Sequence, residues 1–155
     1  MDRERILVKL DEMEGYIKEL KAITPDDFES YERDRIVKRA SERLLHISIE
    51  AAIDVCSILV RELRLGVPAG EGDFFDKLSA RVITKETASR LKEMKNFRNV
   101  IVHRYGGVDD REVYSIIRNR LGIFEDFERE VLDFLRRGKR QKAKGLRKVN
   151  RRRVY

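Results

Sequence analysis

Apolar residues recur at helical spacing along most of this chain, with turn-forming residues between the periodic stretches. The apolar positions between residues 6 and 20 predict a first helix over about residues 3–21. Thr24-Pro25-Asp26-Asp27 indicates a helix start, because a hydroxyl can cap the helix, proline fits its first turn and acids favour its positive end. No glycine or proline follows before residue 63, so we expect this second helix to continue unbroken to there.

Glycine-rich breaks divide the second half of the chain. Residues 64–72 hold three glycines and a proline, and predict a loop. A short helix is expected over residues 73–78, then a helix that Thr84 caps and that runs to about residue 102. Asp109 or Asp110 is expected to open a last helix that ends at Gly138. Four amphipathic helices with short connections predict an all-α fold, an antiparallel four-helix bundle with a short extra helix.

Composition places the chain among intracellular helical proteins of one domain. With 155 residues it is long enough for a single core, and 41% of the residues are charged. The only cysteine, Cys56, excludes an intramolecular disulfide, and no secretory leader pattern is visible, so we expect a cytoplasmic location. The apolar stretch at residues 48–60 is too short and too charged to span a bilayer, so no membrane association is expected.

The net charge of +7 comes from one end of the chain. Residues 138–155 hold nine of the 35 Lys and Arg and no acid, which leaves 26 basic against 28 acidic residues elsewhere. We therefore separate a helical domain, residues 1–137, from a basic tail, residues 138–155, that is expected to be flexible. The tail can contact RNA phosphates or remain a solvated, disordered end. Its candidate RNA-binding residues are Lys139, Arg140, Arg147 and Arg151.

Arg98 and His103 are the candidate catalytic residues. RNA cleavage without a metal needs a group that moves protons near neutral pH and a cation that stabilises the phosphorane-like transition state. Histidine suits the first task and arginine the second. Residues five apart lie about 140° apart around a straight helix. Either the helix ends before His103, or a second copy supplies the missing partner. Alternatively, both residues only interact with the terminal carbonyl groups and the negative end of the helix dipole.

Asn99 lies four residues before His103 and therefore shares its helix face, so Asn99 can hold the imidazole in one tautomer. Glu50 and Asp54 follow His46 at intervals of four on an otherwise apolar helix. They can position the catalytic groups, form a buried polar network, or bind a metal. Metal binding is disfavoured, because bundle metal sites draw ligands from several helices. We expect no metal and no cofactor.

The stretch Met94-Lys95-Asn96-Phe97-Arg98-Asn99-Val100-Ile101-Val102-His103-Arg104-Tyr105 resembles the R-x4-6-H hallmark of HEPN domains. It resembles in particular the R-x4-H-x-Y form of the HepT-type toxins. The resemblance covers about residues 3–135, including residues 48–54, residues 74–78 and the Val108-Asp109 turn with the Val113-Tyr114 pair that follows it. The basic tail lies outside it.

This resemblance implies a usually dimeric helical bundle whose active members are metal-independent endoribonucleases acting on tRNA or mRNA. Arg98 and His103 would be the catalytic pair and Asn99 a polar supporter. Tyr105 matches the tyrosine that a partner nucleotidyltransferase antitoxin can modify with AMP, and the added bulk and charge would exclude RNA phosphate. Tyr105 can also be a half-buried aromatic at the bundle end. Arg104 can contact phosphate or stay solvated.

Two further interpretations stay open. The chain can be a catalytically silent HEPN module that binds nucleotide or RNA, or that docks beside a nucleotidyltransferase. It can also be a purely structural four-helix dimer whose tail is its RNA contact. The presence of both Arg98 and His103 favours the ribonuclease toxin over these alternatives.

Overall fold

The computed structural model describes residues 1–103 and 107–153, apart from the side chains of residues 102, 103 and 148–153. Within these ranges the chain forms α-helices and no strand. The seven helices are α1 (Arg3–Ile23), α2 (Phe28–Arg33), α3 (Arg35–Glu62), α4 (Glu71–Leu78), α5 (Lys85–His103), α6 (Asp110–Asn119) and α7 (Gly122–Arg153).

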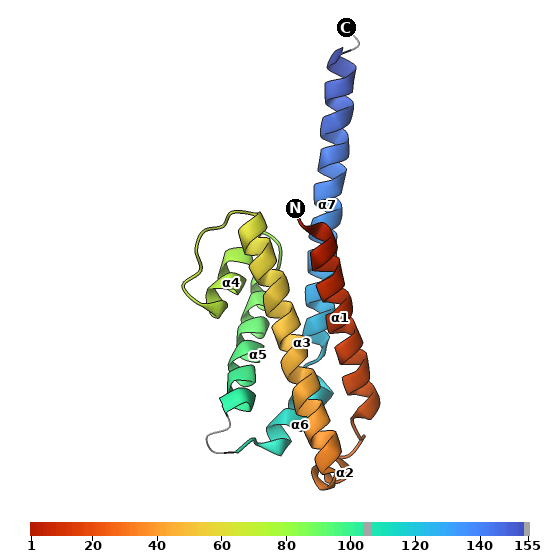
Figure 1. Ribbon diagram of the computed structural model, residues 1–155, viewed down its shortest axis with the longest axis vertical. Coiled ribbons are helices and arrows are strands. Elements are labelled where there is room, and N and C mark those ends of the chain that lie inside the picture. Colours follow the sequence, from red (N-terminus) through yellow and green to blue (C-terminus); the bar gives the residue numbers. More distant parts are fainter. Residues whose placement is uncertain (104–106, 154–155) are drawn as a thin grey trace.

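The four long helices, α1, α3, α5 and α7, run alternately in opposite directions along one axis (Figure 1). The short helix α4 packs on α3 and α5, whereas α2 and α6 lie together at the other end of the bundle. The predicted antiparallel four-helix bundle is confirmed. The number of short helices differs, because two of the expected long helices are each divided in two.

The expected second helix is broken at Asp34. Thr24, the expected cap, instead ends α1, where its hydroxyl donates to the Leu20 carbonyl at 2.6 Å. Asp27 caps the short α2. The backbone at Asp34 is extended, and its carboxylate accepts from the Val37 N–H at 3.0 Å, which starts α3. An aspartate side chain competes for backbone N–H groups in this way, so it can end one helix and cap the next without glycine or proline.

The expected last helix is also wrong in its bounds. It breaks after Asn119 and restarts at Gly122. Glycine has a low helix propensity, but the apolar residues keep their helical spacing across this position, so the pattern gives no sign of the break. Its expected end at Gly138 is not observed, since α7 continues through that glycine to Arg153. A Cβ at Gly138 would meet nothing within 4 Å, so the chain is unconstrained there and the helix bears only the modest cost of one glycine.

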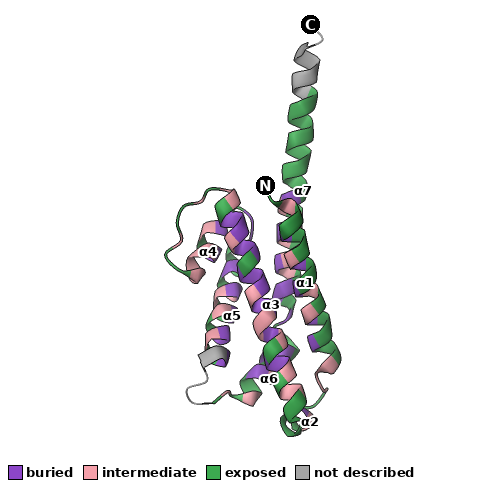
Figure 2. Cartoon of the chain, in the orientation of Figure 1, coloured by how far each residue is buried: buried purple, intermediate pink, exposed green. Residues whose placement is uncertain are grey.

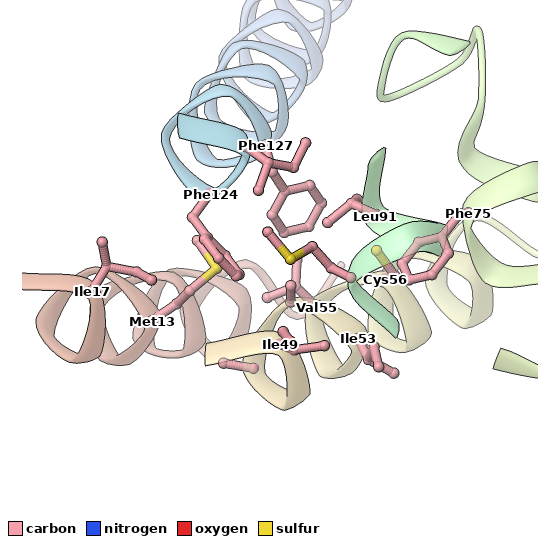
Figure 3. Packing of buried hydrophobic residues seen from close by; sticks show 14 of the residues in the cluster. Met13, Ile17, Ile49, Ile53, Val55, Cys56, Phe75, Leu91, Phe124 and Phe127 are labelled. Carbon is pink, nitrogen blue, oxygen red and sulfur yellow. The ribbon is translucent and has the colours of Figure 1, made fainter. Parts of the chain in front are cut away.

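The core lies where the apolar stripes of the four long helices meet. Met13, Ile49 and Leu91 pack around Phe124 and Phe127 (Figure 3), and buried residues continue along the inner faces of all four helices (Figure 2). Cys56 belongs to this core, and burial raises the pKa of its thiol. Beyond residue 137 the described part of α7 is exposed and projects from the bundle (Figures 1 and 2).

Glu130 of α7 fixes the start of α5. Thr84 caps α5 as expected, because its hydroxyl accepts from the Thr87 N–H at 3.1 Å. The two carboxylate oxygens of Glu130 accept from the Thr84 N–H at 2.6 Å and from the buried Thr87 hydroxyl at 2.5 Å. Farther along, Arg90 pairs with Asp126 at 2.9 Å. These contacts fix how α5 is rotated against α7, and therefore which of its side chains face the bundle interior.

We expect Glu130→Ala to lower the free energy of unfolding by about 1–2 kcal/mol, because the buried Thr87 hydroxyl loses its charged acceptor. Urea denaturation followed by circular dichroism measures this change. Asp133→Ala is the matched control on the same helix, since it removes only an exposed pair with Arg136 and should change stability by less than about 0.5 kcal/mol. Equal losses of stability in the two variants would contradict the conclusion that Glu130 fixes the start of α5.

Candidate functional site

Arg98 is a charged residue on the buried stripe of α5. The stripe passes through Leu91, Met94 and Ile101, and Arg98 falls between the last two at the same helical spacing. The residue is only 8% exposed. Because a buried charge is costly unless it is paired and hydrogen-bonded, neighbouring elements must supply partners for the guanidinium.

Those partners come from three places. Nη1 donates to Glu50 Oε1 of α3 at 2.6 Å and to Glu71 Oε1 of α4 at 3.3 Å, and Nη2 donates to Glu71 Oε2. Nε and Nη2 donate to Asn99 Oδ1 at 3.2 and 2.7 Å. A guanidinium has five N–H groups, and five hydrogen bonds engage it here. The side chain is therefore held in one orientation.

The electrostatics of this cluster keep Arg98 charged. Burial by itself opposes the charge, but the hydrogen bonds and charges of Glu71 and Glu50 outweigh it, and the pKa of Arg98 is raised above its ordinary value. One cation faces two carboxylates, so the cluster carries a net charge of about −1. Each carboxylate side chain is 41% exposed, which leaves the cluster open to solvent on one side.

Glu71 is the member of the cluster that sequence analysis missed. Residues 64–72 were expected to form a loop, whereas α4 begins at Glu71 itself. An acid in the first turn of a helix is common, and Asp73 two residues later has the same property. Asp73 accepts from the Ala69 N–H at 3.0 Å and does not contact Arg98. No pattern in the sequence separates these two acids.

A second chain of polar contacts reaches the cluster along α3. His46 Nε2 lies 3.4 Å from Glu50 Oε1, and His46 Nδ1 lies 3.3 Å from Arg43 Nη1. Since a guanidinium can only donate, Nδ1 must be the acceptor. A neutral imidazole with its proton on Nε2 satisfies both neighbours. His46 thus joins Glu50 as part of a polar network, one of the interpretations that the sequence left open.

Two of the expected supporting residues meet at Arg98 and one does not. Glu50 and Asn99 both accept hydrogen bonds from Arg98. Asp54 is half-exposed and pairs with Lys9 of α1 at 3.7 Å, away from the cluster. Within the described residues, no group of three or more His, Cys, Asp or Glu side chains is placed to hold a metal ion.

Of the remaining expected site residues, those that the structure describes lie at the C-terminal end of α5 and on the projecting part of α7. The backbone of α5 is helical through His103, so this helix does not end before it; the His103 side chain lies outside the described structure, as do Arg104 and Tyr105. Lys139, Arg140 and Arg147 are exposed on the projecting part of α7, and Arg151 is described only in its backbone. Among the described helices, none combines the length and apolar character needed to cross a membrane.

Comparison with known proteins shows which family the chain resembles. A family model for HepT-like ribonucleases matches residues 13–131. The tRNA nuclease HepT of Aphanizomenon flos-aquae is 26% identical over 121 residues, which are 77% of this chain and 80% of that protein. The mRNA nuclease HepT of Shewanella oneidensis is 33% identical over 79 residues, which are 50% of this chain and 59% of that protein.

Solved structures agree with the sequence comparison. The tri-AMPylated HEPN toxin of Shewanella oneidensis, in complex with MNT antitoxin, matches with a TM-score of 0.79 at 25% identity, over 86% of this chain and 99% of that one. The cytosolic protein YutE of Bacillus subtilis matches with a TM-score of 0.75 at 23% identity, over 87% of this chain and 91% of that one, which supports the fold alone. Because the family model matches residues 13–131, well over half of the chain, this chain belongs to the HepT-like ribonuclease family.

Proposed function

We propose that the protein is a metal-independent endoribonuclease, the toxin of a toxin–antitoxin pair whose antitoxin is a nucleotidyltransferase. The observation that carries this proposal is the buried, oriented and permanently charged Arg98, five residues before His103 on one helix. Because the guanidinium is already held in one orientation, little ordering of this side chain remains to be done when a phosphate binds it. Nuclease relatives with tRNA and mRNA substrates support the reaction class.

In the proposed reaction His103 takes the proton from the RNA 2′-OH as that oxygen attacks the adjacent phosphorus. A proton is then delivered to the leaving 5′-oxygen, and the P–O5′ bond breaks. Arg98 stabilises the extra negative charge on the phosphorane-like transition state. RNA supplies its own nucleophile, so neither a serine nor a cysteine is required. Asn99 and Glu50 support the reaction by orienting the Arg98 guanidinium.

A homodimer is part of the proposal, because one helix alone separates its two catalytic residues. The backbone of α5 continues as a helix through His103, so Arg98 and His103 lie about 140° apart around its axis. Two copies facing each other across a shared cleft would let Arg98 of one subunit act with His103 of the other. Each active site would then contain residues from both chains.

The projecting part of α7 is proposed to act as a basic arm that binds RNA outside the cleavage site. Lys139, Arg140 and Arg147 are exposed and form no ion pair with the described residues. Thr87 of α5 contacts Glu130 of α7, so these two residues lie at the same level of the bundle. From that level Arg98 lies in one direction and Gly138 in the other, and a rise of 1.5 Å per residue puts them roughly 30 Å apart along the bundle. The arm would therefore hold a part of the RNA distant from the bond that is cut, with Arg151 farther along it. Arg104, by contrast, is proposed to bind phosphate beside His103.

Tyr105 is the proposed modification site. A HEPN toxin relative is tri-AMPylated and in complex with MNT antitoxin, which supports a nucleotidyltransferase partner for this chain. AMP on Tyr105 would place bulk and negative charge two residues from His103, where they would exclude RNA phosphate.

One observation favours a second candidate, a non-catalytic HEPN module that binds nucleotide or RNA or docks a partner. Five hydrogen bonds already engage the five N–H groups of Arg98, as expected for an arginine whose role is only structural. Cleavage by the purified protein separates the two candidates.

We expect the purified protein to cleave RNA in EDTA, and His103→Ala to lower kcat by at least about 100-fold, because general acid–base catalysis contributes that much. Gel analysis of end-labelled tRNA and mRNA measures both. Arg120→Ala, which removes an exposed arginine that pairs with Glu93, is the control and should keep full activity. If the wild type and His103→Ala cleave equally little, the protein is the non-catalytic module.

Modification is tested with the nucleotidyltransferase of the same organism and ATP. We expect the wild type to gain AMP, detected by mass spectrometry, and to lose RNA cleavage in step with that gain. Tyr105→Phe should stay active and gain no AMP at this position, because it lacks the phenolic oxygen. Tyr114→Phe is the matched control and should still be modified. Full inactivation of Tyr105→Phe by the same treatment would rule out this tyrosine as the switch.

For the arm, we expect replacement of Lys139, Arg140, Lys144 and Arg147 by Gln to raise KM for a full tRNA and to leave kcat unchanged. RNA binding should also depend less on salt. The slope of the logarithm of the binding constant against the logarithm of the salt concentration should become less negative by roughly 0.7–0.9 for each phosphate that the arm no longer neutralises. An RNA of a few nucleotides, too short to reach from the cleavage site to the arm, should be cut with unchanged KM. An equal loss on short and long RNA would place the arm's effect at the cleavage site instead.

A further inference from the structure

The contact between Glu71 and the Arg98 guanidinium has the paired geometry of an arginine–phosphate contact. Nη1 donates to one carboxylate oxygen at 3.3 Å and Nη2 donates to the other, so two nitrogens meet two oxygens of one anion. Arginine grips two phosphate oxygens through the same paired geometry. Glu50 and Asn99 contact the guanidinium differently, because each offers it a single oxygen.

The two carboxylates also differ in how firmly the fold holds them. Glu50 lies in the middle of the 28-residue α3, between residues of the core. Glu71 is the first residue of the eight-residue α4, and Asp73 in the same first turn ties the preceding segment to this helix through the Ala69 N–H at 3.0 Å. The segment before it is exposed, with Val67 93% accessible to solvent. The Glu71 side chain is itself 41% exposed, so it can turn into water without leaving a cavity in the core.

A phosphate that approaches the cluster as it stands would meet a guanidinium whose N–H groups are engaged and a net charge of about −1. Both obstacles disappear if one carboxylate withdraws. Withdrawal of Glu50 would remove a partner that the middle of a long core helix holds in place, whereas withdrawal of Glu71 frees donors on two neighbouring nitrogens, Nη1 and Nη2.

We infer that Glu71 occupies, in the free protein, the position on Arg98 that an RNA phosphate takes during binding. The inference rests on the proposed function, since it assigns the ligand of the Arg98 guanidinium as the phosphate of the RNA to be cut. Glu71 is then an internal competitor that sets RNA affinity, while Glu50 and Asn99 remain in place as positioning residues. Phosphate and carboxylate exchange on the same two nitrogens, Nη1 and Nη2.

The test compares Glu71→Gln with Asp76→Asn. The second substitution removes the same charge from the same helix, but Asp76 pairs with Lys92 and not with Arg98. Binding is measured by fluorescence anisotropy with an uncleavable 2′-O-methyl RNA, and cleavage by steady-state kinetics. We expect Glu71→Gln to tighten Kd and lower KM by roughly tenfold, the value of a charge-assisted contact that no longer competes. Asp76→Asn should change either by less than about twofold, as expected of an exposed pair.

Two further variants separate competition from general electrostatics. Glu50→Gln should lower kcat without tightening Kd, because it removes the support of Arg98 and leaves Glu71 in place. Arg98→Lys keeps the charge but not the paired donors, so adding Glu71→Gln to it should give little of the tenfold gain.

Several outcomes overturn the inference. Equal Kd values for Glu71→Gln and Asp76→Asn would show that Glu71 does not compete, and weaker binding by Glu71→Gln would make it a support like Glu50. If the wild type binds RNA without cutting it and Glu71→Gln still tightens binding, the ribonuclease proposal fails and this inference stands. If the wild type cuts RNA and Glu71→Gln changes neither Kd nor KM, this inference alone fails.

Discussion

One buried cation organises the functional end of this bundle. Arg98 lies on the apolar stripe of α5, where a leucine or methionine would be ordinary, so carboxylates from α3 and α4 must lie close enough to pair with it. Removing one partner of a fully buried ion pair costs about 3–5 kcal/mol, and less for carboxylates that are partly exposed like these. Such a residue is a poor choice for stability alone. Its placement makes sense if the guanidinium must be oriented in advance for an anion.

The sequence predicts those features of the fold that depend on hydrophobic periodicity and on the spacing of nearby residues. The four antiparallel helices and the cap at Thr84 were predictable, because each depends on residues within a few turns of one another. Two breaks were not predicted: the one at Asp34, where α2 ends and α3 begins without glycine or proline, and the one between Asn119, where α6 ends, and Gly122, where α7 begins. Sequence analysis also missed Glu71, which meets Arg98 from 27 positions away through the packing of α4 on α5. Tertiary packing decides such contacts, and no local pattern encodes them.

Membership of the HepT-like ribonuclease family gives the cluster a chemical context that geometry alone lacks. Under the proposed function, the cluster and the basic arm would divide the work of RNA binding. The arm would supply attraction that does not depend on RNA sequence, and it projects from the end of the bundle opposite the C-terminus of α5 (Figure 1). The cluster around Arg98, with its excess of negative charge, would disfavour loose phosphate contact and, as we infer, would admit an anion by exchange with Glu71.

A crystal structure with bound RNA tests the central claim most directly, with a single 2′-deoxy nucleotide at the cleavage position to prevent attack. We expect two oxygens of the scissile phosphate on Nη1 and Nη2 of Arg98, the Glu71 side chain turned toward solvent, and Glu50 and Asn99 still bound to the guanidinium. An intact contact between Arg98 and Glu71, with the scissile phosphate bound elsewhere, would contradict this claim.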